Sequence, residues 1–382
     1  MRRHAALPAE PVPEEDPTTA PLDPVAVLAS PSAAGGAVVA ALASITGAEV
    51  QALARRLEWH RVEGLAWRTL AALPPEGIDP WLRASLRRRH QLIAAATLAQ
   101  GLALAEILEA IGRAGIPLAV LRGLRVVEWI YKDAGARPFE DHDLLVRPAD
   151  ADATGAILRR LGFEAIATGL FRRASIAIDL HTEPLGARRR PERARLFPID
   201  TATLFRDARP GWVSGGPVML LRDEDDVLLL ALHVVKHSFD RLIRTADLAH
   251  LVAVHGRSIS WERVRERAAA VHAGRLVALA FAAAAGFGSA VPPALVPSTP
   301  PGPLESLLLR RVAALRPLPY GGEILMALSA PRLRDRLRFV IDALLPGGEA
   351  PHGRWQPADV PRRAVVLLDG ALRRSGDRRQ AR

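Results

Sequence analysis

The spacing of apolar residues changes near residue 117, and this change constrains the fold more than any other feature. Between residues 37 and 114, apolar residues recur every three or four positions, as on the buried face of helices. The apolar runs at 117–121 and 142–146 are short and continuous, which is typical of buried strands. Strand-like and helical segments then alternate up to about residue 221, where the helical spacing returns.

This pattern predicts an α+β fold with five segments. A small mixed β-sheet core spans residues 116–221, an N-terminal helical segment spans 36–115, and a C-terminal helical bundle spans 222–345. Residues 1–35 hold seven prolines and little that can be buried, so we expect a disordered leader. The arginine-rich residues 346–382 are expected to form a flexible basic tail.

The composition excludes several classes of function. The chain has no cysteine, which excludes disulfides, thiolate metal sites and a cysteine nucleophile. Its formal net charge is +10, but arginine and alanine enrichment is typical of GC-rich coding, so the charge alone does not indicate nucleic-acid binding. No apolar run follows the basic N-terminus, and the uncharged stretch 276–304 is too weakly apolar for a bilayer. We therefore expect a soluble, cytoplasmic protein.

Three aspartates carry the chemical signal. Asp141 and Asp143 lie two residues apart at the start of a strand, so their side chains share a face. Two such carboxylates repel each other unless a cation lies between them. Mg²⁺ is a suitable cation, because it binds carboxylates together with phosphate oxygens. Asp179 interrupts another apolar strand. If the strands are neighbours, the three carboxylates form a two-metal phosphoryl-transfer site. The alternative is that Asp179 lies on an edge strand and faces water.

The motifs around these aspartates resemble those of a known family. They are Leu121-Arg122-Gly123, an 18-residue step to Asp141, the run Asp-His-Asp-Leu-Leu-Val at 141–146 and Ile-Asp-Leu-His at 178–181. Together they resemble the DNA polymerase β-like nucleotidyltransferase superfamily and, more narrowly, the bacterial uncharacterised nucleotidyltransferase family. Further positions in step with that family are Tyr131, Arg137-Pro138, Glu224-Asp225, His233, His237 and Asp247-Leu248. The resemblance covers roughly residues 37–285.

The resemblance implies a Mg²⁺- or Mn²⁺-dependent enzyme. It would move a nucleoside monophosphate from a nucleoside triphosphate (NTP), with ATP the expected donor, to an acceptor hydroxyl and release pyrophosphate. Asp141 and Asp143 would bind both metal ions, and Asp179 would complete the acceptor-side metal and help to deprotonate the acceptor. Gly123 would let the backbone approach the triphosphate.

Two positions depart from the family pattern. Arg122 replaces the usual lysine, and arginine holds phosphate differently from lysine. His142 replaces an apolar residue, and we expect it to point to the opposite face as a buried, hydrogen-bonded histidine.

Other residues have a functional and a structural interpretation. We expect Arg137 either to pair with Asp141 or a phosphate, or to anchor its turn. We expect His181 to order Asp179 by hydrogen bonding. Lys236, on one helix with His233 and His237, would line the cleft near the phosphates, with a structural zinc or plain packing as alternatives. Asp247 would pair with Arg241 or Arg244. The basic loop 188–195 could grip an acidic acceptor or RNA, or lie solvated on the surface.

Two other functions remain compatible with the sequence. One is a non-catalytic nucleotide-binding or scaffold member of the same fold in a biosynthetic operon, and the other is an RNA-directed, toxin-like transferase. The acceptor remains open among small molecules, peptides, protein hydroxyls and RNA ends. The sequence does not indicate the oligomeric state or the preferred base.

Overall fold

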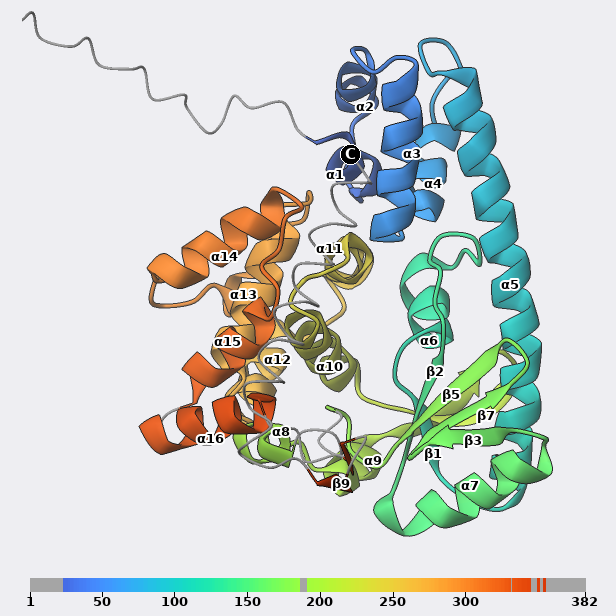
Figure 1. The fold of residues 1–382 in the computed structure, drawn as a ribbon, viewed down its shortest axis with the longest axis vertical. Helices are drawn as coiled ribbons and strands as arrows, with labels where there is room; N and C mark the ends of the chain where they lie inside the picture. The colour runs from blue at the N-terminus through green and yellow to red at the C-terminus, as the bar shows by residue number, and fades with distance from the viewer. Residues whose placement is uncertain (1–22, 186–190, 331, 345–348, 351–352, 355–382) are drawn as a thin grey trace, which may run out of the picture.

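A computed structural model describes residues 23–185, 191–330, 332–344, 349–350 and 353–354. It confirms the α+β class, with a five-stranded mixed sheet and a two-stranded sheet flanked by many helices. Figure 1 shows the sheets at the lower right, the N-terminal helices above them and the C-terminal helices on the left. The long helix α5 (Pro80–Arg113) runs along the right edge from the N-terminal helices to the sheets.

The N-terminal segment folds into five helices. Asp79 caps α5 by accepting a hydrogen bond from the Leu82 amide, and Pro80 occupies its first turn. The prediction that residues 1–35 are disordered is wrong for the helix α1 at 24–29. Asp23 caps this helix, which buries Val27 and Leu28. Residues 1–22 lie outside the described residues. The other helices of this segment are α1 (Pro24–Ala29), α2 (Gly35–Leu42), α3 (Ala48–His60) and α4 (Glu63–Ala71).

The main sheet has the strand order β1-β2-β5-β4-β3. Its strands β2 (His142–Val146) and β5 (Ile176–His181) are parallel neighbours, and the other pairs are antiparallel. The apolar run at 142–146 is therefore an inner strand, whereas the run at 117–121 forms the edge strand β1 beside it. The remaining elements here are β1 (Leu118–Val120), α6 (Leu124–Val126), the π-helix η1 (Val127–Tyr131), η2 (Pro148–Asp150), α7 (Ala151–Arg160), β3 (Glu164–Ala167) and β4 (Leu170–Arg173).

The sequence predicts a loop over residues 182–215 and a last strand at 218–221, and the structure differs. The described part contains two short helices, α8 (Pro191–Leu196) and α9 (Thr201–Asp207). The strands β6 (Arg209–Val213) and β7 (Gly216–Leu220) then form a hairpin of their own. This hairpin packs against α5 and β1 but does not join the main sheet. The short polar connections gave no periodic signal from which these elements could be predicted.

The C-terminal segment is helical, and its first two helices are largely buried. Both α10 (Asp223–Lys236) and α11 (Leu242–His255) bury most of their residues. Four acidic residues in the first turn of α10 stabilise this helix, because their negative charges lie at the positive end of the helix dipole. The predicted tail 346–382 lies mostly outside the described residues. The other elements are α12 (Trp261–Ala270), α13 (Gly274–Ala285), η3 (Pro293–Leu295), α14 (Pro303–Ala313), α15 (Gly321–Ser329), α16 (Leu333–Leu344), β8 (Glu349–Ala350) and β9 (Gly353–Arg354).

Among the described residues, α5 alone is long and apolar enough to cross a membrane, by length and composition only. Its most apolar 18-residue window is 28% buried within the fold. Core helices of water-soluble proteins meet the same criterion, and α5 packs along α4 and β7.

A buried ion pair ties the loop before β2 to α11. The Arg137 guanidinium donates to both carboxylate oxygens of Asp247 at 2.9–3.0 Å, and the Tyr131 hydroxyl donates to Asp247 at 2.8 Å. Both charged residues are more than 90% buried. The partner of Asp247 is thus neither Arg241 nor Arg244, which corrects that expectation. Arg137 pairs with Asp247 rather than Asp141, in line with the expected structural alternative, and its charge also acts on Asp143. A well-paired arginine can be buried, whereas a lone one cannot.

We predict that Arg137→Met lowers the free energy of unfolding by about 3–5 kcal/mol, because it leaves the Asp247 carboxylate buried without its cation. The double variant Arg137→Met/Asp247→Leu should lose less than Arg137→Met alone, since no buried charge remains. Chemical denaturation measures both, with the exposed Arg113→Met as a control that changes stability by less than about 0.5 kcal/mol. A double variant at least as unstable as the single one would contradict this interpretation.

Candidate functional site

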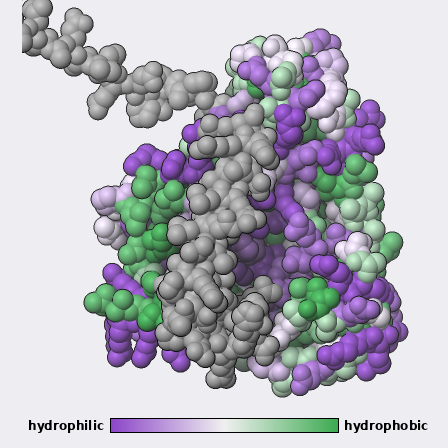
Figure 2. Space-filling view, in the orientation of Figure 1, coloured by the Kyte–Doolittle hydropathy of each residue, from purple (hydrophilic) through white to green (hydrophobic). Residues whose placement is uncertain are grey.

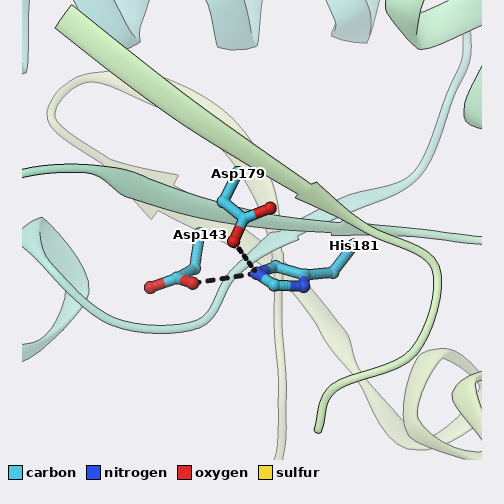
Figure 3. A group of neighbouring side chains, drawn as sticks. All are labelled: Asp143, Asp179 and His181. Atoms are coloured by element: carbon cyan, nitrogen blue, oxygen red, sulfur yellow. Dashed lines mark hydrogen bonds and ion pairs between the residues drawn. The ribbon is translucent and has the colours of Figure 1, made fainter. Parts of the chain in front are cut away.

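The two central strands place two carboxylates side by side. Asp143 on β2 lies directly opposite Asp179 on β5 in the parallel register. Figure 3 shows the two side chains on the same side of the sheet. One ligand atom each from Asp143, Asp179 and His181 lies within 4.8 Å of the other two, and this is the only such group of three among the described residues. The predicted convergence of residues 143 and 179 is therefore present in the structure.

His181 joins the two carboxylates. It follows Asp179 by two residues on β5, so both side chains share one face of the strand. Its Nε2 lies 2.8 Å from Asp143 Oδ1 and 3.5 Å from Asp179 Oδ2 (Figure 3). When protonated, this nitrogen donates to the carboxylates, and when deprotonated it is a metal ligand. The sequence analysis gave His181 only the role of ordering Asp179, although the i, i+2 spacing already placed it on the ligand face.

Arg122 supplies the fixed positive charge of the cluster. It follows β1, where the Leu121 amide donates to the Asp143 carbonyl at 3.0 Å. Its Nε donates to Asp143 Oδ2 at 2.8 Å, and its Nη2 forms a second, short ion pair with Oδ1. Burial alone would raise the pKa of the Asp143 carboxyl, but the Arg122 charge and the hydrogen bonds from Arg122 and His181 hold it well below its usual range. The planar guanidinium fork suits this two-point contact, which a lysine could not make.

Asp141 lies at the edge of this cluster. It precedes β2, is partly buried, and lies outside the group of three ligand atoms described above. Burial and the nearby charge of Asp143 raise its pKa. Gly123, with φ of +58°, packs against it, since a Cβ at residue 123 would lie 3.3 Å from the Asp141 carbonyl oxygen. Gly123 is therefore required for the close approach of the two loops that carry Arg122 and Asp141.

The C-terminal helices add cations to the same place. Lys236, at the end of α10, interacts electrostatically with both Asp143 and Asp179. Burial, together with the charges of Arg122 and Arg193, lowers the pKa of Lys236 to about 8. Arg193 on α8 is buried, and its Nη2 lies 3.7 Å from Glu323 Oε1. Several mutually repelling cations thus surround the two carboxylates.

Arg244 on α11 and Arg61, at the end of α3, extend this basic group. Burial and the Arg137 charge lower the pKa of Arg244, which pairs with Asp240. Burial and the Arg244 charge lower the pKa of Arg61, whose charge also interacts with Asp141. Arg61 and Arg244 could not be predicted as site residues, because each lies about 60 residues from the nearest motif and has no motif of its own. We call Arg61, Arg122, Arg193, Lys236 and Arg244 the basic cluster.

The other predicted residues lie elsewhere. His142 is fully buried against Phe139, with ring centroids 5.5 Å apart, but neither ring nitrogen has a hydrogen-bond partner, so the expected hydrogen bond is absent. Burial lowers its pKa to about 4, which keeps it neutral. Residues 186–190 of the basic loop lie outside the described residues, and the remainder of that loop begins α8.

His233 and His237 contact each other in a tilted arrangement, with ring centroids 4.4 Å apart and an angle of 54° between the ring planes. Burial, followed by nearby positive charges, lowers the pKa of both imidazoles. No third ligand groups with them among the described residues, so the zinc alternative gains no support. Their position beside Lys236 is that of neutral side chains packed behind the basic cluster.

Comparison with known proteins identifies one family. The model of a family described as uncharacterised nucleotidyltransferase matches residues 46–288, which is more than half of the chain. This range includes β1, β2, β5 and helices α3 to α13, and thus every residue of the carboxylate pair and the basic cluster. No curated protein and no solved structure matches this chain.

We predict that Mn²⁺ binds at the Asp143–Asp179–His181 group in the absence of a nucleotide. Asp179→Asn and His181→Gln should each weaken binding at least about tenfold, because each removes one ligand of a small donor set. Electron paramagnetic resonance of free Mn²⁺ measures the affinity. Asp152→Asn, on the exposed face of α7, is the matched control and should bind as the wild type does. An equal Mn²⁺ affinity in the wild type and all three variants would show that the metal ion does not bind at this group.

Proposed function

Because the chain belongs to the uncharacterised nucleotidyltransferase family, we propose that it transfers a nucleoside monophosphate from an NTP, with ATP the expected donor, to an acceptor hydroxyl. The observation that carries the proposal is the juxtaposition of two carboxylates on adjacent parallel strands with the basic cluster around them. Carboxylates suit divalent cations, and a group of crowded cations suits a polyphosphate. A metal-bound nucleoside triphosphate needs carboxylates for its metal ion and cations for its phosphates within one site, and few other ligands do.

The donor set fits a divalent metal ion. Two carboxylates and one imidazole lie within coordinating reach of a common point, and oxygen-rich sets of this kind favour Mg²⁺ or Mn²⁺. Such an ion, when bound, would neutralise phosphate charge and polarise the phosphorus. Asp143 and Asp179 would hold it, with His181 as an additional ligand or as their hydrogen-bond donor. Asp141, predicted as a third carboxylate ligand, lies close enough to act through its charge.

The residues of the chain divide the remaining work. Arg122 fixes the Asp143 carboxylate in one orientation through its two-point contact. Lys236 and Arg244 would bind the non-transferred phosphates and stabilise the charge of the departing pyrophosphate. The acceptor oxygen forms a bond to the α-phosphorus as the bond to the pyrophosphate oxygen breaks. Asp179, partly exposed, would accept the proton that the acceptor hydroxyl loses.

We predict that label from an α-³²P NTP, but not from a γ-³²P NTP, is transferred in the presence of Mg²⁺ or Mn²⁺. Candidate acceptors are RNA 3′ ends, peptides, small hydroxylated metabolites and the chain itself. Asp179→Asn should lower the rate at least about 10²- to 10³-fold, because it removes a carboxylate that acts in the transition state. Asp152→Asn should retain the wild-type rate, and thermal melting of both variants checks that they fold.

Two outcomes would overturn the proposal. Transfer that is undiminished in Asp179→Asn would place the chemistry at another site. Tight NTP binding without transfer to any acceptor would favour the non-catalytic nucleotide-binding member of the fold.

We predict that the KM for the NTP rises as the pH increases above about 8. Lys236 carries its charge below its pKa of about 8 and loses it above, so attraction for the triphosphate falls there. In the wild type, the KM should rise by a factor that approaches ten per pH unit. In Lys236→Arg the rise should begin at a higher pH. In Lys236→Met it should be absent, because the KM of this variant is already high at pH 7. A pH profile of KM in Lys236→Met that equals the wild-type profile would exclude Lys236 from phosphate binding.

A further inference from the structure

Helix α5 carries an apolar stripe on its outer face, and we propose that a second copy of this chain docks on it as an antiparallel helix. The stripe is formed by Leu92, Ala95, Ala99 and Leu102, all exposed. Their spacing of three, four and three residues is that of a helix–helix seam. Leu92 is 53% exposed and Leu102 is 77% exposed, with Leu98 beside them at 64%.

No element of the described part of the chain covers the stripe. The opposite face of α5 buries Ile93, Thr97, Gly101 and Leu104, where Gly101 packs against Ser214 and Leu124. At 100° per residue, this buried row lies about 180° from the stripe. Figure 2 shows apolar surface gathered along the right edge of the molecule, where α5 runs in Figure 1. Leu92, Leu98 and Leu102 are large apolar side chains that lie close together on the surface, and such an exposed apolar patch marks an interaction site.

The stripe is symmetric about its own centre. Leu92 and Leu102 lie five residues on either side of residue 97, and Ala95 and Ala99 lie two residues on either side. An antiparallel pairing about a two-fold axis at residue 97 therefore places Leu92 against Leu102 of the second copy and Ala95 against its Ala99. The small alanines at the centre let the helices approach to about 8 Å. A two-fold axis requires such a self-complementary patch.

The charges at both ends select the antiparallel direction. Arg88 and Glu106 lie on the same stripe, nine residues on either side of residue 97, and both are exposed. The antiparallel pairing brings Arg88 against Glu106 of the second copy twice over. A parallel pairing would instead stack Arg88 on Arg88 and Glu106 on Glu106. Glu106 already pairs with Arg173, but its side chain remains 48% exposed and can accept a second cation.

The absence of cysteine in the chain allows a direct test of this geometry. Ala95→Cys and Ala99→Cys are made separately and oxidised alone or mixed. The antiparallel pairing predicts a disulfide-linked dimer only in the mixture, because only residue 95 of one copy meets residue 99 of the other within disulfide reach. In a parallel pairing each variant would cross-link alone. Cross-linking in neither case, at a concentration of about 100 µM, would overturn the proposal.

Mass measurement separates a dimer from other occupants of the stripe. Light scattering of the unmodified chain should give a concentration-dependent mass that approaches twice 41.2 kDa. Ala99→Arg, a surface change to a good helix former, should weaken dimerisation at least tenfold without changing the thermal melting of the monomer. A monomer at every concentration, or binding to phosphatidylcholine vesicles that Ala99→Arg abolishes, would show that the stripe serves another surface. The proposal does not depend on the transferase activity.

Discussion

The structure depends on the placement of two carboxylates on adjacent parallel strands. Asp143 and Asp179 face each other across β2 and β5, and two ionised carboxylates at this separation repel strongly without a cation beside them. Arg122 and His181 provide that charge and hydrogen bonding within the protein itself. The parallel pair β2 and β5 thus sets where a divalent cation can bind.

The helical segments are fastened to the sheet at points near this pair. The Arg137–Asp247 ion pair joins the loop before β2 to α11, and Arg125 on α6 donates to Asp226 in the first turn of α10. Burial raises the pKa of Asp226 to about 7, although the Arg125 charge opposes the shift. The attachment at its first turn fixes α10, whose far end carries Lys236. The basic cluster is therefore positioned by buried ion pairs rather than by the sheet alone.

The sequence predicted the features that depend on local spacing. Strand periodicity placed β2 and β5, but the i, i+2 spacing of Asp141 and Asp143 did not bring Asp141 into the group of ligand atoms. Sequence-based prediction failed where long-range packing decides, as for α1, whose apolar residues become buried against α2, α3, α4 and α11. Arg244 could not be assigned to the site for the same reason, because folding brings it there across about 100 residues of chain. The partner of Arg137 was also hidden, since many acidic residues were equally available in sequence.

The central claim is that Asp143 and Asp179 hold a divalent cation together with an NTP. Anomalous diffraction from crystals grown with Mn²⁺ and a non-hydrolysable NTP tests it most directly. The account predicts manganese density within about 2.5 Å of oxygens from both aspartates, with the phosphates directed toward Lys236. Manganese bound only to the nucleotide, with both aspartates beyond coordination distance, would contradict it.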